Sequence, residues 1–324
     1  MSETATRQAP LGGSGIEVCR LCLGGNVFGG NADQEASFAV LDTYLELGGN
    51  FIDTADVYSR WLPGHRGGES ESVIGRWMAS RGVRDRVVVA TKVGSAMGPG
   101  PENKGLHRAH LERALKASLK RLQIETIDVY YAHQDDPATP LEETLEVFDG
   151  FVRAGSVRCL GASNYPAERL RQALELQADR GWSRYEVLQP PYSLMNRLAF
   201  EGPLSEVCRE LGLAVFGYAA LAGGFLTGKY RRDAELPPSA RARSVKERYI
   251  DERGWRVVET LVEVARERGD TPAQVALAWV LAKPGITGPI AAAMSPAQMR
   301  ELWQALGIRL SEEEMRRLDQ ASAA

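Results

Sequence analysis

The strongest constraint on the fold is the alternation of short β-type runs with longer helical stretches along the whole chain. Each run is rich in Val, Ile, Leu or Tyr and is bounded by Gly, Pro, Asn or Asp, which is typical of strands. Most runs lack polar alternation, as expected of strands that are buried on both faces. The eight predicted strands span residues 18–25, 50–55, 86–93, 127–133, 156–163, 185–190, 213–219 and 288–293.

Helical patterns separate these runs. The first predicted helix lies within residues 33–49, with Asp33 as its N-cap and Gly48 as its stop. Right-handed crossovers between parallel strands leave two closures, an open doubly wound sheet and a closed barrel. Eight units in 324 residues favour an α/β fold of the (β/α)₈ TIM-barrel type. Further helices are predicted at 106–122, 140–155, 166–181 and 203–212.

Three segments fall outside the repeating units. Residues 11–18, LGGSGIEV, predict a small N-terminal β-hairpin that caps the bottom of the barrel. The insertions 94–105 and 231–251 follow the third and seventh predicted strands, so we expect long loops at the C-terminal face, where barrel active sites lie. No change of composition marks a boundary, so one domain over 1–324 is predicted.

Charge and hydropathy exclude several function classes. The net charge of -3, from 39 basic and 42 acidic residues, predicts neither a nucleic-acid partner nor an anionic membrane surface. No apolar run approaches the roughly 18 residues of a spanning helix. The first residues lack the apolar segment of a signal peptide. We therefore expect a cytoplasmic protein, and the sequence leaves its oligomeric partner open.

Neither of two common nucleotide-binding motifs is complete in this chain. No G-x-G-x-x-G follows a predicted strand. Residues 223–230, GGFLTGKY, match G-x-x-x-x-G-K, but Tyr230 stands where a P-loop needs Ser or Thr to bind magnesium. Hydrolysis of a nucleoside triphosphate is therefore not expected, although glycine amides at this position suit another phosphate.

Metal catalysis is a third hypothesis that the sequence disfavours. Asp53, Asp56 and the HQDD run at 133–136 resemble parts of a barrel hydrolase, but only four histidines occur and none forms an H-x-H pair. The spacing of His107 and His110 predicts a surface pair on a helix. The four cysteines, Cys19 and Cys22 included, are expected to be structural, so no metal site is predicted.

Polar residues stand at the C-terminal ends of most predicted strands. Asp53, Lys92 and His133 end three successive strands, and Tyr58 follows shortly after Asp53. A buried lysine is rare unless it is paired, so packing alone does not explain this set. Later strands end in Ser163, Asn164, Gln189 and Tyr218.

These residue types together predict proton transfer to a carbonyl oxygen. A tyrosine pKa is about 10, and a neighbouring Lys92 ammonium is expected to lower that of Tyr58. Asp53 would keep Lys92 protonated, and His133 would donate a hydrogen bond to a substrate oxygen. Tyr58 is then a general acid for an oxygen that becomes an alkoxide. Without a metal or nucleophile, this chemistry calls for hydride from a nicotinamide cofactor.

The strand ends also predict where a nicotinamide binds. The amide and hydroxyl groups of Ser163, Asn164 and Gln189 suit a carboxamide. The ring of Tyr218 offers a surface for stacking. The substrate side is less constrained, and Trp61 and Met97 are expected to line it. A polar pocket suits a keto-sugar, whereas an apolar one suits an aromatic aldehyde.

Several segments resemble the aldo-keto reductase family over nearly the whole chain. They are IDTADVY (52–58), ATK (90–92), YYAH (130–133), GASN (161–164), LQPPYSL (188–194) and GYAALAGGFLTGKY (217–230). Residues 57–72, VYSRWLPGHRGGESES, resemble the bacterial branch. The resemblance implies a (β/α)₈ barrel, extended NADPH, and reversible reduction of a small aldehyde or ketone. Its catalytic residues fall on Asp53, Tyr58, Lys92 and His133.

The same resemblance implies a cofactor groove. After the last strand the family usually shows G-A-R-x-x-x-Q-x-x-x-N, a stretch that grips the adenosine 2′-phosphate, whereas residues 292–302 read AAMSPAQMREL. Because Met294 replaces an arginine or serine there, we expect NADP(H) with weaker discrimination against NAD(H). The implied cofactor contacts are Gly24, Gly25, Ser163, Asn164, Gln189, Tyr218, Ala219, Leu221, Gly223, Lys229, Ala292 and Gln298.

A binding role is the main alternative to an enzyme. Relatives on the same fold include potassium-channel β-subunits, so the resemblance also admits an NADPH-binding, redox-sensing regulatory subunit with little turnover. The intact set of Asp53, Tyr58, Lys92 and His133 favours the enzyme.

Overall fold

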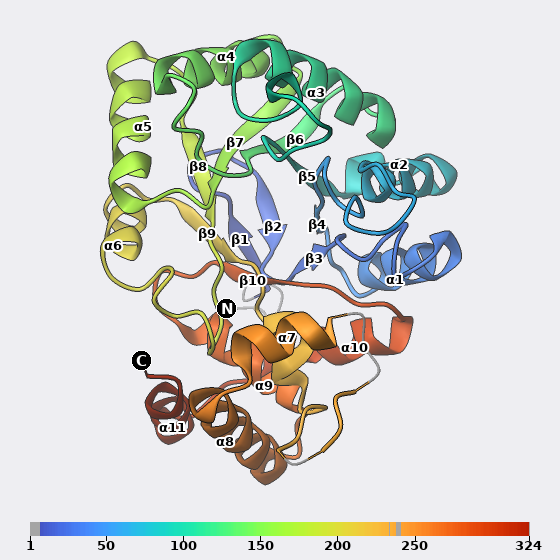
Figure 1. Cartoon of the computed structure of the whole chain (residues 1–324), viewed down its shortest axis with the longest axis vertical. Helices are drawn as coiled ribbons and strands as arrows, with labels where there is room; N and C mark the ends of the chain where they lie inside the picture. Colours follow the sequence, from blue (N-terminus) through green and yellow to red (C-terminus); the bar gives the residue numbers. More distant parts are fainter. Residues whose placement is uncertain (1–6, 233, 238–240, 324) are drawn as a thin grey trace.

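Eight parallel strands close into a barrel in the computed structural model, which describes residues 7–232, 234–237 and 241–323. Each strand pairs with the next one along the chain, and β10 pairs with both β9 and β3, which closes the ring (Figure 1). The predicted (β/α)₈ barrel is therefore confirmed. The strands are β3 (Cys22–Gly24), β4 (Phe51–Asp53), β5 (Val88–Val93), β6 (Ile127–Ala132), β7 (Val157–Ser163), β8 (Tyr185–Gln189), β9 (Ala214–Gly217) and β10 (Gly288–Ala291).

Helices surround this barrel, with α1 to α6 along one part of the ring and α7 to α11 gathered along the rest (Figure 1). The Asp33 side chain accepts a hydrogen bond from the Ala36 amide at 2.9 Å, so the predicted N-cap of α1 is confirmed. The helices are α1 (Gln34–Glu46), α2 (Glu69–Arg81), α3 (Arg108–Leu122), α4 (Leu141–Arg153), α5 (Ala167–Arg180), α6 (Pro203–Glu210), α7 (Ala242–Tyr249), α8 (Glu252–Arg268), α9 (Pro272–Ala282), α10 (Pro296–Gln304) and α11 (Glu312–Ser322).

The predicted strand 18–25 is wrong in one respect, because it contains two strands. Residues Gln8–Pro10 (β1) and Glu17–Cys19 (β2) form an antiparallel hairpin, and β3 begins only at Cys22. The chain turns at Arg20, whose guanidinium donates to the carbonyl oxygens of Leu281 and Thr287, both at 2.9 Å. These contacts attach the turn to α9 and to the residue before β10. The apolar run 18–25 therefore contributes one strand to the hairpin and one strand to the barrel.

The hairpin covers the N-terminal end of the barrel, as predicted. The Gly13 amide donates to the carboxylate of Glu186 on β8 at 2.8 Å, and the Cys19 amide donates to Asn50, just before β4, at 2.7 Å. Three hairpin side chains, Leu11, Ile16 and Val18, join the hydrophobic cluster inside the barrel. The bottom is therefore closed by apolar packing, and only the C-terminal end is left for a site.

Side chains inside the barrel follow the two-residue period of each strand. On β5, Val88 and Ala90 belong to the inner cluster, and the next inward position is Lys92. On β6, Val129 and Tyr131 belong to it, and the next such position is His133. Continuing the same alternation leads from core residues on the other strands to Asp53, Ser163, Gln189 and Tyr218. The polar residues are thus the top layer of the interior.

Gly161 shows how closely this interior is packed. A Cβ atom at Gly161 would overlap the Tyr131 ring. A larger residue on β7 would therefore displace the aromatic ring that lies one layer below the polar residues. This contact gives a packing reason for the glycine of the GASN run.

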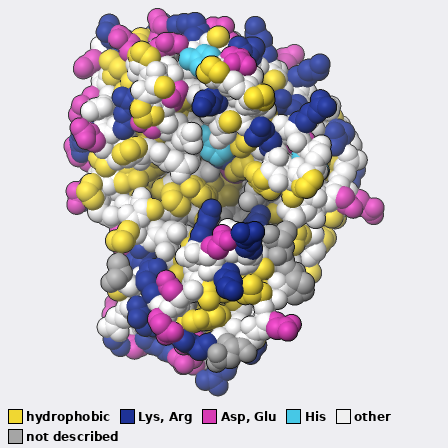
Figure 2. Space-filling view, viewed as in Figure 1, with side chains coloured by type: hydrophobic (Ala, Val, Ile, Leu, Met, Phe, Trp, Pro, Cys, Tyr) yellow, Lys and Arg dark blue, Asp and Glu magenta, His cyan; other side chains and the backbone are white. Residues whose placement is uncertain are grey.

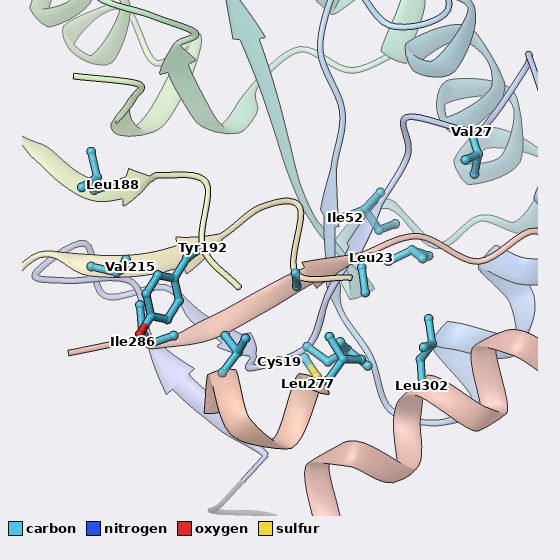
Figure 3. Packing of buried hydrophobic residues seen from close by; sticks show 14 of the residues in the cluster. Cys19, Leu23, Val27, Ile52, Leu188, Tyr192, Val215, Leu277, Ile286 and Leu302 are labelled. Carbon is cyan, nitrogen blue, oxygen red and sulfur yellow. The ribbon is translucent and has the colours of Figure 1, made fainter. Parts of the chain in front are cut away.

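A second hydrophobic layer lies between the strands and the helices. Leu23 and Ile52 face each other on β3 and β4 and pack in one cluster with Leu277 of α9 (Figure 3). In the same layer, a Cβ at Gly75 of α2 would overlap the backbone of Arg121 on α3, so these helices approach closely. No helix in the described ranges is both long and apolar enough to cross a membrane.

The two predicted long loops follow β5 and β9. Residues 94–105 contain only a short 3₁₀ turn, Pro101–Asn103. The second insertion, predicted as a loop over 231–251, is partly wrong because α7 forms within it. Val245 of α7 is buried, and its side chain would contact a Cβ placed on Gly223 at 3.2 Å. Packing against the turn after β9 therefore stabilises α7, although the polar sequence of this segment does not predict a helix.

The hairpin should contribute to stability as part of the inner core. Because Leu11 is fully buried, Leu11→Ala should lower the unfolding free energy by about 2–5 kcal/mol. The matched control, Leu198→Ala, changes a side chain that is 77% exposed and should alter it by less than about 0.5 kcal/mol. Urea unfolding would measure both, and equal losses would contradict this role of the hairpin.

Candidate active site

The Lys92 ammonium organises the polar layer at the C-terminal end of the barrel. Its Nζ donates to Asp53 Oδ2 at 2.7 Å, to the Thr54 carbonyl at 2.8 Å and to Tyr58 Oη at 2.9 Å. These three contacts use the three hydrogens of the ammonium. The side chain is fully buried, and these partners hold its ammonium in place.

Asp53 is paired through both carboxylate oxygens. Oδ2 faces Lys92, and Oδ1 accepts a hydrogen bond from Gln189 Nε2 at 2.8 Å. A buried ion pair is tolerated when additional hydrogen bonds satisfy its remaining atoms, and Gln189 supplies such a bond. The Gln189 amide nitrogen thus holds Asp53, while the predicted contact of Gln189 with a cofactor carboxamide stays a prediction.

The pKa of Tyr58 differs from the sequence-based expectation in direction. Burial of the hydroxyl and the negative charge of Asp53 raise the pKa of Tyr58 well above its ordinary value. The Tyr58 hydroxyl also lies 3.3 Å from Asp53 Oδ2. At neutral pH this residue therefore keeps its proton, which is the form that a proton donor requires.

His133 is held by its backbone immediately after β6. Its amide donates to the Val93 carbonyl at 2.8 Å, and its carbonyl accepts from Asn164 Nδ2 at 2.8 Å. The imidazole packs edge to face with Tyr58, with ring centroids 6.2 Å apart. Burial, together with the charge of Lys92, lowers the pKa of His133 to about 3, so the ring is neutral near pH 7.

The next strand ends form a connected polar network beside these residues. Ser163 donates to the Gln189 carbonyl at 2.8 Å, Asn164 Nδ2 donates to Ser163 Oγ at 3.0 Å, and the Tyr218 hydroxyl donates to Asn164 Oδ1 at 2.8 Å. Asn164 has a φ of 54°, a left-handed conformation that asparagine tolerates. The network fixes the Tyr218 ring, while contact of these groups with a cofactor stays a prediction.

The turn after β9 contains several left-handed residues. Ala219 and Ala222 have φ values of 55° and 47°, and Gly223 and Gly224 have values of 68° and 95°. For alanine this conformation costs about 1–2 kcal/mol, so the surrounding structure must impose it. Successive amides in such turns form concave anion sites. Lys229 packs beside Gly224, which places a cation at the turn.

The resemblance of this turn to a P-loop is confined to its sequence. A 3₁₀ segment, Ala222–Thr227, follows β9 here, with Gly223 and Gly224 in non-helical conformations. Leu221 precedes the segment. A P-loop leads instead directly into a helix.

Four further expected cofactor contacts lie at the end of β3 and after β10. A Cβ at Gly24 would make a tight contact with Ile290 at 3.2 Å, and one at Gly25 would lie 2.9 Å from Ser70 Oγ, so protein packing disfavours a larger residue at both positions. Gln298 Oε1 accepts from the Met294 amide at 2.8 Å. Met294 and Gln298 are exposed, and Ala292 is half-buried near them.

Hydrophobic side chains gather around the hollow near the centre of the face in Figure 2, and Lys and Arg side chains lie along its lower edge. Trp61 lies next to Tyr58 with ring centroids 5.9 Å apart, and it is 55% exposed. Met97 of the loop after β5 lies close to Gly67, in the segment that follows Trp61. An exposed indole therefore stands directly beside the tyrosine.

Several of the residues considered for a metal site have other partners, although the buried carboxylate of Asp56 has no hydrogen-bond partner among the described residues. The prediction that His110 is a surface residue is wrong, because it is buried and only 4% exposed, while His107 accepts a hydrogen bond from its amide. Asp135 pairs with Arg169 at 2.9 Å, and Asp136 accepts from the Leu106 amide at 2.8 Å. Among the residues that the structure describes, no three His, Cys, Asp or Glu side chains gather as metal ligands would.

Sequence reasoning missed two groups in this site. One is the Thr54 carbonyl, because a backbone acceptor leaves no signal in the residue type. The other is Ser95, whose hydroxyl lies 3.2 Å from His133 Nδ1. A hydroxyl in the predicted loop after the Lys92 strand was the available signal, but loop conformation decides where it points.

Comparison with known proteins agrees with this geometry. The model of the Aldo/keto reductase family matches residues 20–323. The chain is 37% identical to the uncharacterized oxidoreductase YrpG of Bacillus subtilis, over 95% of this chain and 94% of the relative. It is 32% identical to norsolorinic acid reductase of Aspergillus flavus, over 95% and 79%. It is also 32% identical to a probable voltage-gated potassium channel subunit beta of Oryza sativa, over 92% and 90%.

The environment of His133 predicts that its ring does not titrate near neutrality. The folded-state pKa of about 3 lies below the ordinary 6.5, so the unfolded chain binds more protons between these values. The part of the stability that His133 carries should therefore be complete above about pH 6.5 and be lost as the pH falls toward 3.

Proton NMR of the imidazole from pH 8 to 5 would test this, with His133→Asn identifying the resonance. We expect a flat His133 shift, and a wild-type stability that falls relative to His133→Asn between pH 7 and 5. A midpoint near 6.5 would show that the ring is not shielded as described.

Proposed function

Because this chain belongs to the aldo/keto reductase family, we propose that it reduces a small-molecule aldehyde or ketone to an alcohol with a nicotinamide dinucleotide, NADPH being the expected form. The observation that carries this proposal is the Tyr58 hydroxyl held 2.9 Å from the buried ammonium of Lys92. A protonated phenol backed by a fixed cation is suited to give a proton to an oxygen that becomes negative.

Each residue of the cluster has a distinct part in that transfer. Tyr58 Oη gives its proton to the carbonyl oxygen, and Lys92 Nζ then faces the phenolate that remains. This attraction is stronger after proton transfer than before it, which is the condition for lowering a barrier. Asp53 and Gln189 hold the ammonium in place before the substrate arrives. A bound reduced nicotinamide supplies the hydride that the carbonyl carbon gains.

The cofactor is expected along one side of this cluster. Ser163 and Asn164 would bind the carboxamide, and the Tyr218 ring, which Asn164 orients, would stack on the nicotinamide. The turn from Ala219 to Lys229 would hold the pyrophosphate, because its left-handed residues form a tight turn with the Lys229 ammonium beside Gly224.

The substrate would enter from the side of His133 and Trp61. A neutral His133 adds a second hydrogen bond to the carbonyl oxygen beside Tyr58. The substituent on the carbonyl carbon would then lie against the exposed indole of Trp61. This surface supports an aldehyde or ketone with an apolar or aromatic group over a keto-sugar.

Replacing the proposed acid should abolish turnover without loss of cofactor. Tyr58→Phe removes only the hydroxyl, so carbonyl reduction should fall by at least about 10²–10⁴-fold. Cofactor affinity should change little. Cofactor absorbance, followed with a panel of aryl and alkyl aldehydes and ketones, would measure carbonyl reduction. Fluorescence titration would measure cofactor affinity.

Tyr130→Phe is the matched control, because the Tyr130 hydroxyl is also buried but has no hydrogen-bond partner in the described part of the chain. It should keep wild-type activity within about threefold. If Tyr58→Phe did so too, the assignment would be wrong. Tight cofactor binding without turnover of any carbonyl compound would favour the regulatory alternative, which the similarity to a channel subunit keeps open.

The residues after β10 should reduce the preference of the protein for NADPH over NADH. Met294 is 48% exposed and offers no charge to a 2′-phosphate, whereas an arginine would add a charge-assisted hydrogen bond of about 1.5–3 kcal/mol. Arg300 of α10 is directed toward Glu46 at 3.6 Å. We infer that NADPH is preferred, by a margin smaller than is usual in the family.

Met294→Arg should therefore tighten NADPH binding about ten- to hundredfold and leave NADH binding unchanged. Met294→Gln is the uncharged control and should change neither. Fluorescence titration of both cofactors would measure this. A wild-type preference above about a thousandfold for NADPH would refute the inference and indicate another basic residue at the phosphate.

A further inference from the structure

We propose that Ser95 is a positioning residue that selects the tautomer of His133, by donating its hydroxyl hydrogen to Nδ1 so that Nε2 carries the ring proton. The proposal deepens the proposed carbonyl reduction and rests on it. It starts from the hydrogen-bond distance of 3.2 Å between Ser95 Oγ and His133 Nδ1.

Backbone hydrogen bonds and side-chain contacts together hold the His133 imidazole in place. The His133 amide is bound to Val93 and its carbonyl to Asn164, so the main chain cannot rotate without breaking both bonds. The ring edge packs against Tyr58. Ser95 holds the remaining side of the ring, and no hydrogen-bond partner within the described ranges reaches Nε2. Nε2 is therefore the nitrogen left for a substrate.

A neutral ring must choose between two tautomers. The Lys92 charge and burial disfavour the doubly protonated imidazolium, so one nitrogen donates and the other accepts. The carbonyl oxygen of a substrate offers lone pairs only. It is attracted to an Nε2–H group and repelled by an Nε2 lone pair. Carbonyl binding beside Tyr58 thus requires the proton on Nε2 and an unprotonated Nδ1.

Ser95 is placed to enforce that choice. It follows β5 by two residues, in a loop whose two ends are joined by the hydrogen bond from the Gly105 amide to the Gly94 carbonyl at 2.9 Å. His133 Nδ1 is the one acceptor that the Ser95 hydroxyl reaches among the described residues. Donation to Nδ1 satisfies the hydroxyl and leaves the proton on the opposite nitrogen.

The kinetic test compares Ser95→Ala with Ser95→Thr. Ser95→Ala removes the donor and should lower kcat/KM for a reactive aryl aldehyde about 3- to 10-fold, the worth of one hydrogen bond. Cofactor affinity should not change, because Ser95 touches His133 and not the predicted cofactor groove. Ser95→Thr keeps a hydroxyl and should restore activity to within about twofold of wild type. If the alanine variant fails to fold, Ser95→Cys keeps the volume with a weaker donor.

Nitrogen NMR of protein labelled at histidine gives a readout that packing alone would not move. Only four histidines occur in the chain, and His133→Asn identifies the resonances of His133. In wild type we expect a pyridine-type Nδ1 and a protonated Nε2. Ser95→Ala should shift this population toward the other tautomer or a mixture, and Ser95→Thr should not.

The outcomes separate this proposal from the function on which it rests. A wild-type ring protonated on Nδ1, or a Ser95→Ala variant unchanged in both tautomer and kcat/KM, would overturn the role of Ser95 even if carbonyl reduction is found. Conversely, the expected spectra with no turnover of any carbonyl compound would leave the tautomer selection standing and overturn the proposed reduction.

Discussion

The arrangement of this protein's polar layer depends on one buried ion pair, between Lys92 and Asp53. An ammonium with no exposure to water is stable only if each of its hydrogens finds an acceptor. Asp53, the Thr54 carbonyl and the Tyr58 hydroxyl meet that requirement, and Gln189 completes the carboxylate. The same demand that makes the pair stable brings a tyrosine hydroxyl against a cation. Stability and the proposed chemistry therefore share their contacts.

The interior of the barrel connects this pair to the rest of the fold. Apolar side chains occupy the lower inward layers, and the hairpin seals them from below. The top layer has no such cover, so it is where charged groups can both pack and meet a ligand. As a member of the aldo/keto reductase family, the chain is an oxidoreductase, and the position of its polar layer agrees with that class. The strained turn after β9 and the helix α7 packed on it lie outside the barrel core.

Burial acts in opposite ways on the two titratable groups next to Lys92. It raises the pKa of Tyr58, which keeps a proton to donate, and it lowers the pKa of His133, which keeps a lone pair on one nitrogen. Both groups are thus neutral before reaction, although a cation lies beside them. A neutral histidine donates through one ring nitrogen and accepts through the other, so the hydrogen bond between Ser95 and Nδ1 bears on which nitrogen faces the substrate as a donor.

Much of this was readable from the sequence alone. Apolar runs separated by helical patterns predicted the barrel, and the positions of Asp53, Lys92 and His133 at the ends of three successive predicted strands placed them at one face, because the C-terminal ends of parallel barrel strands lie together. Tertiary structure decided what depends on distant segments. It divided residues 18–25 between two sheets, raised rather than lowered the pKa of Tyr58, turned Gln189 toward Asp53 and brought Ser95 to His133. Local sequence patterns cannot predict these features. The burial of a side chain, the electrostatic field around it and its hydrogen-bond partners are fixed only when strands far apart in the chain close into one barrel.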